Sequence, residues 1–204
     1  MAVPIYDVAI IGTGPAGGLA AVTLAKSGAR VLILEKEKLP RTKACGGALS
    51  KGPVDRLLDW NFDSVIAARC GSIRYLLNYE RDFCVERQKP ITFVNRAEFD
   101  LHLVERALSL SPSTVTLIDD CDIRGLEQED GHVQLTSRSG QTFSARFVID
   151  AGGVSGPGRK AIGRPRPVRM APSIDVEVGL DPKLWDEDRN RVTFNFDCIS
   201  GGYG

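Results

Sequence analysis

The sequence predicts an α/β fold, with one domain built around a parallel sheet and a second domain rich in β-strands. Two observations support this prediction. The first thirty-five residues read strand, glycine-rich turn, helix, strand and a terminal acid, the order of a βαβ unit. Further along, apolar and polar residues alternate over 70–94, with the period of two typical of strands, and strand-like segments recur between 113 and 150.

The glycine turn of the βαβ unit has the spacing of a dinucleotide-binding site. Strand 5–11 leads into Gly12-Thr13-Gly14-Pro15-Ala16-Gly17, a helix over 15–27 follows, and strand 31–34 ends at Glu35. Gly12 permits a tight turn, Gly14 lets the backbone approach a pyrophosphate, and Gly17 lets helix and strand pack closely. The helix N-terminus then faces the phosphates, and Glu35 is placed to accept hydrogen bonds from a ribose. A glycine turn without a ligand is the simpler alternative, which the complete order of parts disfavours.

The remaining elements follow from periodicity and from turn or capping residues. A basic loop covers 36–51, a short helix runs from Pro53 to about Trp60, and the strands of 70–94 come next. Asn95 is a good N-cap for a second helix, with Glu98 near a capping-box position and an apolar stripe of Phe99, Leu101, Val104 and Leu108. Later segments are strands over 113–118, 121–128, 132–137 and 142–150, a short helical stretch over 156–163, a Pro/Arg link over 164–167, and strands near 173–179 and 191–197.

These elements predict two domains, each built from separated parts of the chain. We expect residues 1–60 and 95–163 to form a Rossmann-like nucleotide-binding domain. Residues 65–94 and 165–204 would form the second, β-rich domain. In α/β folds of this kind a ligand is expected between the domains.

Composition restricts the class of function. The chain has 204 residues, 43% hydrophobic and 25% charged, with a formal net charge of zero, so nothing suggests nucleic acid as a partner. No apolar run approaches the roughly 20 residues that span a bilayer, and we expect a cytoplasmic protein, peripheral to a membrane at most. The five cysteines form no Cys-x-x-Cys pair and the two histidines are isolated, so we expect neither a metal site nor a disulfide framework.

Three further features favour FAD over NAD as the dinucleotide. The loop after Glu35 carries Pro40-Arg41-Thr42-Lys43-Ala44-Cys45-Gly46-Gly47, a helix is headed by Asn95-Arg96, and a second glycine motif occurs at 150–153. With these motifs the whole chain resembles the geranylgeranyl reductase family, within the p-hydroxybenzoate-hydroxylase-like group of FAD enzymes. The Lys-x-Cys-Gly-Gly motif carries this resemblance more specifically than the first glycine motif does.

The resemblance implies positions for the cofactor. Glu35 and the first glycine motif would hold the ADP half of FAD, Arg41 and Arg96 would reach the cofactor, and Cys45-Gly46-Gly47 would lie beside the flavin ring. The expected FAD-binding residues are Gly12, Gly14, Pro15, Ala16, Gly17, Glu35, Lys36, Arg41, Cys45, Gly46, Gly47, Arg96, Asp150 and Gly153.

The resemblance also implies an activity: reduction of carbon–carbon double bonds in a geranylgeranyl or other polyprenyl substrate, by hydride transfer from reduced FAD and addition of a proton. NADPH or ferredoxin would supply electrons, and the lipid substrate would bring the protein to a membrane surface. Cys45 and Tyr203 are the candidate catalytic residues, and no proton donor is assigned. At 148–153 the sequence Val-Ile-Asp-Ala-Gly-Gly instead resembles flavin halogenases and cyclases, so a flavin monooxygenase or halogenase is the alternative enzyme.

Several of these residues have simpler interpretations. Arg41 and Lys43 could be solvated loop charges, Arg96 an exposed first-turn residue, and Cys45 an inert buried residue. The other cysteines are expected to be packing residues in strands: Cys70, Cys84, Cys121 and Cys198.

The C-terminus departs from the family pattern. Tyr203-Gly204 match the first two residues of the family's Tyr-x-Trp-x-Phe-Pro motif, and the chain stops there. We therefore expect an N-terminal half with an incomplete β-rich substrate domain that binds FAD weakly by itself. A nucleotide-binding fragment without turnover is the non-enzymatic alternative.

Overall fold

The structure is a computed structural model that describes residues 5–49, 52, 62–164, 174–176, 179, 181 and 190–198. Its contacts divide the chain into two units: 1–43 with 97–172, and 44–96 with 173–204. The expected helix over 53–60, the candidate Tyr203 and most of the expected strand near 173–179 lie outside the described residues. Residues 174–176 are described, and they do not form a strand.

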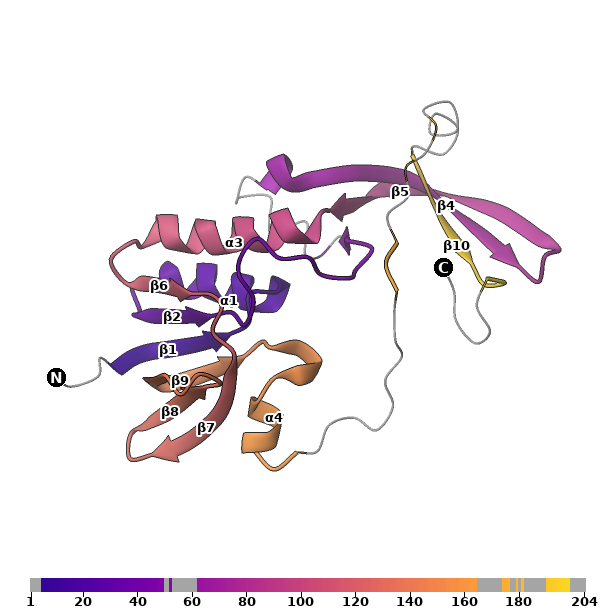
Figure 1. Ribbon diagram of the computed structural model, residues 1–204. Helices are drawn as coiled ribbons and strands as arrows, with labels where there is room; N and C mark the ends of the chain where they lie inside the picture. Colours follow the sequence, from indigo (N-terminus) through magenta and orange to yellow (C-terminus); the bar gives the residue numbers. More distant parts are fainter. Residues whose placement is uncertain are drawn as a thin grey trace. The chain divides into compact units, whose positions relative to one another are not determined.

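The first unit contains a six-stranded sheet in the order β6-β2-β1-β9-β8-β7 (Figure 1). Strands β6 (Val115–Ile118), β2 (Val31–Leu34), β1 (Ile5–Ile11) and β9 (Thr142–Asp150) run parallel. Strands β8 (His132–Ser137) and β7 (Ile123–Glu129) continue antiparallel from β9. The parallel strands therefore bring the ends of β1, β2 and β9 to one edge, where ligands bind in open α/β sheets.

Two longer helices pack in this unit, α1 (Pro15–Ala25) and α3 (Arg96–Leu110). They approach closely, because a Cβ placed on Gly18 of α1 would lie 2.7 Å from the Cβ of Leu103 in α3. The buried residues of α3 are Phe99, Asp100, Leu103, Val104 and Ala107. The predicted stripe is thus correct for Phe99 and Val104, whereas Leu101 and Leu108 are only half-buried. A 3-10 turn, η3 (Gly153–Ser155), and the short helix α4 (Gly158–Ala161) follow β9.

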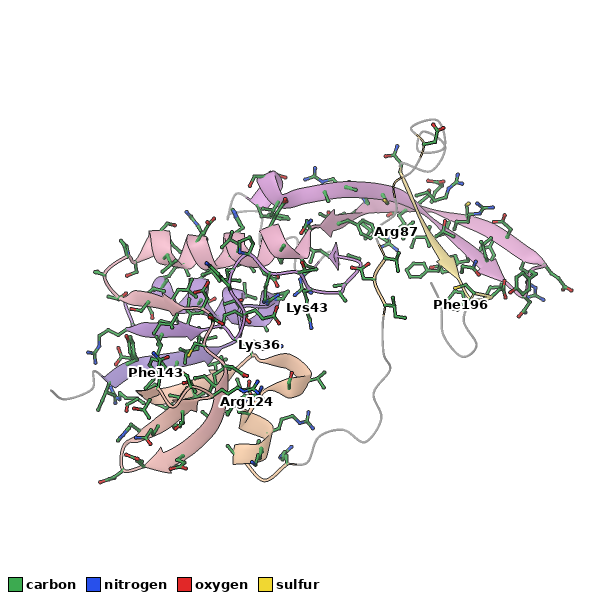
Figure 2. All side chains as sticks on the ribbon, viewed as in Figure 1. Lys36, Lys43, Arg87, Arg124, Phe143 and Phe196 are labelled. Carbon is green, nitrogen blue, oxygen red and sulfur yellow. The ribbon has the colours of Figure 1, made fainter. Side chains whose placement is uncertain are left out.

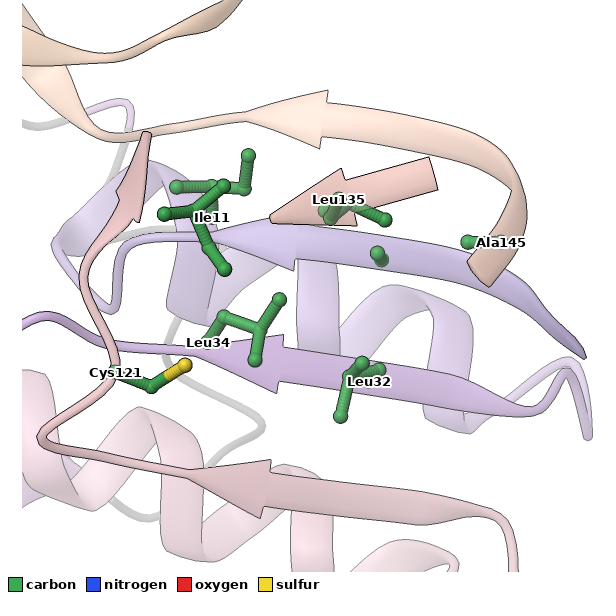
Figure 3. Packing of buried hydrophobic residues seen from close by; sticks show 8 residues of the cluster. Ile11, Leu32, Leu34, Cys121, Leu135 and Ala145 are labelled. Carbon is green, nitrogen blue, oxygen red and sulfur yellow. The ribbon is translucent and has the colours of Figure 1, made fainter. Parts of the chain in front are cut away.

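One face of the sheet carries a continuous apolar cluster (Figure 3). Alternate residues of the parallel strands point to this face, as the period of two requires, and they meet side chains of the antiparallel strands. The buried members are Ala9, Ile11, Leu32, Leu34, Cys121, Ile123, Leu135 and Ala145. The βαβ unit and the antiparallel strands therefore share a core that fixes the ends of β1 and β2.

The second unit contains a four-stranded sheet in the order β10-β4-β5-β3. The 3-10 turn η2 (Phe62–Val65) precedes the long hairpin of β4 (Ile66–Leu77) and β5 (Arg81–Val94), with β10 (Arg191–Asn195) and β3 (Ala48–Leu49) at the edges. Tyr75 stacks between Phe83 and Phe194, with ring centroids 5.2 and 5.8 Å apart. The α/β fold class is confirmed, including a unit built around β-strands.

Candidate dinucleotide site

The turn after β1 is as tight as the glycine motif predicts. Gly12 has φ +92°, and its N–H donates to the Leu34 carbonyl at 2.7 Å, which ties the turn to β2. A Cβ on Gly12 would lie 2.7 Å from the Ala151 carbonyl oxygen, and one on Gly17 would overlap the carbonyl oxygen of Gly12. Both positions therefore need glycine for the helix, the turn and β9 to approach one another.

The N-terminus of α1 has no side-chain cap. Gly14 is its N-cap in extended conformation, Pro15 follows, and the first turn contains no acidic residue. Pro15 and Ala16 are exposed. The positive end of the helix dipole is thus left for an anion, as a pyrophosphate site requires.

Glu35 is almost completely buried, with 3% of its surface exposed. Its Oε2 accepts hydrogen bonds from the N–H of Thr13 at 2.9 Å and from the Thr13 hydroxyl at 2.6 Å, and its Oε1 accepts one from the N–H of Glu37 at 3.2 Å. Burial raises the pKa of Glu35, but the Thr13 hydrogen bonds, the Arg41 charge and the Glu37 N–H outweigh burial and hold the pKa below its ordinary value. The carboxylate is therefore ionised and fixed at the end of β2.

Arg41 joins Glu35 to α3. Its Nε lies 3.2 Å from Glu35 Oε2, and its Nη1 lies 3.1 Å from Asp100 Oδ2. The Arg41 side chain is 8% exposed and that of Asp100 is fully buried, so the interpretation of Arg41 as a solvated loop charge is wrong. The Nη1 group has no acceptor in hydrogen-bond geometry among the described residues, so its contact with Asp100 is an ion pair. Thr13, Glu35, Arg41 and Asp100 form what we term the buried carboxylate centre.

Sequence reasoning assigned no role to Thr13 or to Asp100. The position of each residue in its element could nevertheless have identified it. Ile11 pairs with Leu34 in the parallel register, so Thr13 and Glu35 both lie just past the same sheet edge. Asp100 follows Phe99 on the buried side of α3, and a buried carboxylate requires a partner.

A cavity of about 130 Å³, which we term the dinucleotide crevice, lies at the carboxyl edge of the sheet, between the glycine turn and the start of β7. Its lining includes Gly12, Lys36, Cys121, Arg124 and Gly152. Figure 2 shows the two cations, Lys36 and Arg124, at this edge. Small-molecule pockets usually measure about 300–1,000 Å³, so this cavity is smaller than a pocket that holds a whole ligand. Lys36 and Arg124 are the cations of its lining, and Asp122, which pairs with Arg124, lines it as well.

Asp150 ends β9 and holds the loop that follows. Its carboxylate accepts hydrogen bonds from the N–H groups of Gly152 at 2.9 Å and Gly158 at 2.6 Å. Gly153, the other residue expected here, has φ +67° and starts η3. This loop lines the dinucleotide crevice through Gly152, Ser155 and Pro157.

The Cys45-Gly46-Gly47 turn belongs to the second unit. Cys45 and Gly46 are exposed, and Gly47 is buried with φ +70° and bonds β5 through its carbonyl, which accepts from the Val94 N–H at 3.0 Å. The exposure of Cys45 contradicts its interpretation as an inert buried residue. Lys43 is also exposed, and Arg96 begins α3 as expected.

The remaining cysteines divide into two pairs. Cys70 and Cys121 are buried, as expected of packing residues, and burial raises the pKa of both thiols. Cys84 and Cys198 are exposed, so the prediction that they pack in the interior is wrong. Among the described residues, no helix has the length and apolar character needed to cross a membrane.

Comparisons with known proteins agree with this geometry. The family model described as FAD dependent oxidoreductase matches residues 7–156. The digeranylgeranylglycerophospholipid reductase 2 of Methanopyrus kandleri is 29% identical over 97% of this chain and 50% of its own length. The chain spans about half the length of the curated relatives it matches.

The chain resembles two solved structures, one of a reductase-like protein and one of a halogenase. A geranylgeranyl bacteriochlorophyll reductase-like protein from Thermoplasma acidophilum matches with a TM-score of 0.71 and 23% identity, over 95% of this chain and 51% of that one. CmlS, a flavin-dependent halogenase, matches with a TM-score of 0.63 and 27% identity, over 78% of this chain and 31% of that one.

Proposed function

The chain belongs to the family of FAD-dependent oxidoreductases, and from this premise we propose that it reduces carbon–carbon double bonds of a polyprenyl substrate. The observation that carries the FAD part is the buried carboxylate centre beside an uncapped helix N-terminus. The observation that carries the substrate is the Cys45-Gly46-Gly47 turn after Lys43, in which Cys45 and Gly46 are exposed, together with the similarity to a prenyl-lipid reductase.

We propose that the first unit binds the ADP half of FAD. Among the described residues, Glu35 Oε1 accepts one hydrogen bond, the long 3.2 Å bond from the Glu37 N–H, so it has capacity to accept ribose hydroxyl groups. Gly14, Pro15, Ala16 and the helix N-terminus would face the pyrophosphate, with Lys36 on the same side. When bound, FAD supplies the two-electron reduction, and the protein supplies binding, orientation and exclusion of water.

The second unit offers an apolar surface suited to a hydrocarbon chain. Phe83 of β5 and Phe196, the residue after β10, are exposed, and Phe83 stacks on Tyr75. Val85 follows Phe83 on the same face of β5, because the two residues are two positions apart, and it is also exposed. Exposed apolar side chains that gather in a large patch mark interaction sites. This surface supports an isoprenoid as the substrate class.

A spectrum and an assay test the proposal in sequence. The purified chain is incubated with FAD, desalted, and examined for retained flavin absorbance; an extended protein is tested in the same way if flavin is lost. The flavin-loaded protein is then reduced without oxygen and given geranylgeranyl lipid, and the product is analysed by mass spectrometry. We expect two hydrogens to be added for each double bond reduced. An unchanged lipid with full flavin occupancy would contradict the proposal.

Cys45 provides a sharper test of the second unit. We propose that it contacts the flavin or the substrate, so Cys45→Ser is expected to lower the rate of alkene reduction at least severalfold. Cys84→Ser is the matched control, because Cys84 is also exposed and also lies in the second unit. Equal rates in both variants would show that Cys45 is not part of the site.

A flavin monooxygenase or halogenase is the second candidate. The sequence Val148–Gly153 and the similarity to CmlS favour it. Oxygen consumption that depends on an aromatic substrate, in place of anaerobic alkene reduction, would support this candidate. NADPH or ferredoxin as electron donor, a cytoplasmic location and peripheral membrane contact through the lipid substrate remain parts of the proposal.

A further inference from the structure

A second cavity, strongly basic, lies between the start of β7 and α4. It has a volume of about 630 Å³, within the usual range for ligand pockets. Four cationic residues line it, Arg124, Arg159, Lys160 and Arg164, and no carboxylate does so among the described residues. The chain as a whole has a formal charge of zero, so this concentration of positive charge is local.

The charge of this basic cavity is only partly neutralised. Arg124 pairs with Asp122, through a 2.8 Å hydrogen bond from its Nε. Lys160 and Arg164 have no ion-pair partner among the described residues, and both are exposed. Ser155 also lines the cavity and offers a hydroxyl donor. Two uncompensated cations beside a hydroxyl match the chemistry of a phosphate group, which accepts several charge-assisted hydrogen bonds.

The basic cavity adjoins the dinucleotide crevice without coinciding with it. Both cavities are lined by Ile123, Arg124, Ser155 and Pro157. Arg159, Lys160 and Arg164 line only the basic cavity, whereas Gly12 and Lys36 line only the crevice. We propose that the basic cavity is a second anion site, which binds a phosphate group of a ligand other than the dinucleotide in the crevice. The dinucleotide in the crevice rests on the proposed function, whereas the basic cavity and its charges do not.

The phosphate group could belong to a lipid headgroup or to a free phosphorylated molecule. An apolar cavity of about 680 Å³ shares Arg159 with the basic cavity, and Leu126, Val133, Phe147 and Ile162 are among its lining. Phe147 and Ile162 are 66% and 69% exposed. Apolar and basic surfaces are thus adjacent along α4, an arrangement that an anionic phospholipid would also satisfy.

Inorganic pyrophosphate is the probe for the shared chemistry. Its binding to the chain is measured by calorimetry, first without FAD and then with saturating FAD. The test variant is Lys160→Gln with Arg164→Gln, which leaves every crevice-lining residue intact. The control is Lys89→Gln with Arg138→Gln, which removes the same charge from two exposed positions that line neither the basic cavity nor the crevice.

We expect the test variant to bind pyrophosphate at least tenfold more weakly than the wild type, with thermal stability unchanged. The control should change affinity less than twofold. Equal losses in the two variants would show non-specific attraction and overturn the proposal. A site abolished by saturating FAD, together with weaker FAD binding by the test variant, would make the basic cavity part of the dinucleotide site and also overturn it.

Vesicles distinguish the two sources of the phosphate group. Sedimentation with phosphatidylglycerol vesicles, but not with phosphatidylcholine vesicles, that is lost in the test variant and kept in the control would assign a lipid headgroup. Tight pyrophosphate binding without vesicle binding would assign a free phosphorylated ligand. Binding of neither probe would overturn the site.

Discussion

Arg41 in the first unit and Arg74 in the second make the same kind of contact in different surroundings. Arg41 pairs with Glu35 and Asp100, and all three side chains are less than a tenth exposed. Arg74 forms a two-pronged pair with Asp82 at 2.9 and 2.6 Å, but the two side chains are 33% and 51% exposed. The shorter bonds belong to the more exposed pair. Distance alone therefore does not show which ion pair matters for stability, whereas burial does.

The difference follows from what each pair does in its unit. The buried carboxylate centre connects the glycine turn, the loop after β2 and α3, and thereby fixes the edge at which we propose a dinucleotide binds. The Arg74–Asp82 pair spans adjacent strands of a hairpin that backbone hydrogen bonds already hold together. A preorganised ligand site needs buried contacts that join separate elements, whereas a surface hairpin does not.

Substitution of Arg41 and of Arg74 should give the largest difference between the two units in the free energy of unfolding. Arg41→Met removes the cation that pairs with both buried carboxylates, so we expect a loss of about 3–5 kcal/mol in the free energy of unfolding. Arg74→Met should cost a small fraction of that amount. Urea denaturation followed by circular dichroism gives both values, and hydrogen exchange at β1 and β4 amides shows which unit is affected.

Arg41→Lys is the control for charge, because it keeps a cation but loses the planar guanidinium group, whose N–H donors reach two carboxylates. We expect it to recover only part of the stability. Equal losses for Arg41→Met and Arg74→Met would contradict the view that burial decides between them.

Glycines in the two units offer a second contrast, of intermediate size. A Cβ on Gly17 would overlap the backbone oxygen of Gly12, so Gly17→Ala should cost about 1–3 kcal/mol and weaken FAD binding. Gly71 in β4 has open space around its missing side chain and no positive φ, so Gly71→Ala should be close to neutral. Thermal unfolding with and without FAD measures both effects. A Gly17→Ala chain with unchanged stability would show that α1 moves without penalty.

The contrast also explains what the sequence could predict. Local signals placed the βαβ unit, its glycine turn, Glu35 and the start of α3, because each depends on residues close together in sequence. The Arg41–Asp100 ion pair joins residues far apart in the chain, and only the packing of the loop against α3 brings them together. The exposure of Cys84 was missed because alternation identifies a strand but does not tell which face another element covers, and Cys198 lies beyond the end of β10.

The smallest expected effect is the pH dependence of stability, which should distinguish the carboxyl group of Glu35 from that of Asp82. The pKa values of Glu35 and Asp82 both lie below their ordinary values of 4.5 and 3.8. A carboxyl group with a lowered folded-state pKa adds stability above its unfolded-state pKa. That stability is lost as the pH falls through the folded-state pKa. We therefore expect Glu35→Gln to be less stable than the wild type at pH 7, and the difference to shrink as the pH is lowered below about 4.5.

Salt then distinguishes the two groups. The Asp82 carboxyl is exposed, and its pKa is lowered chiefly by the hydrogen bond from Arg74, so 1 M NaCl should screen most of the effect of Asp82→Asn at pH 7. Glu35 is buried and held by Thr13 as well as Arg41, so the effect of Glu35→Gln should persist in the same salt. Urea denaturation at pH 7 and pH 3, in low and high salt, measures both. If salt removed the Glu35 effect as completely as that of Asp82, the centre would be open to water, and the proposed fixed acceptor for the ribose would lose its support.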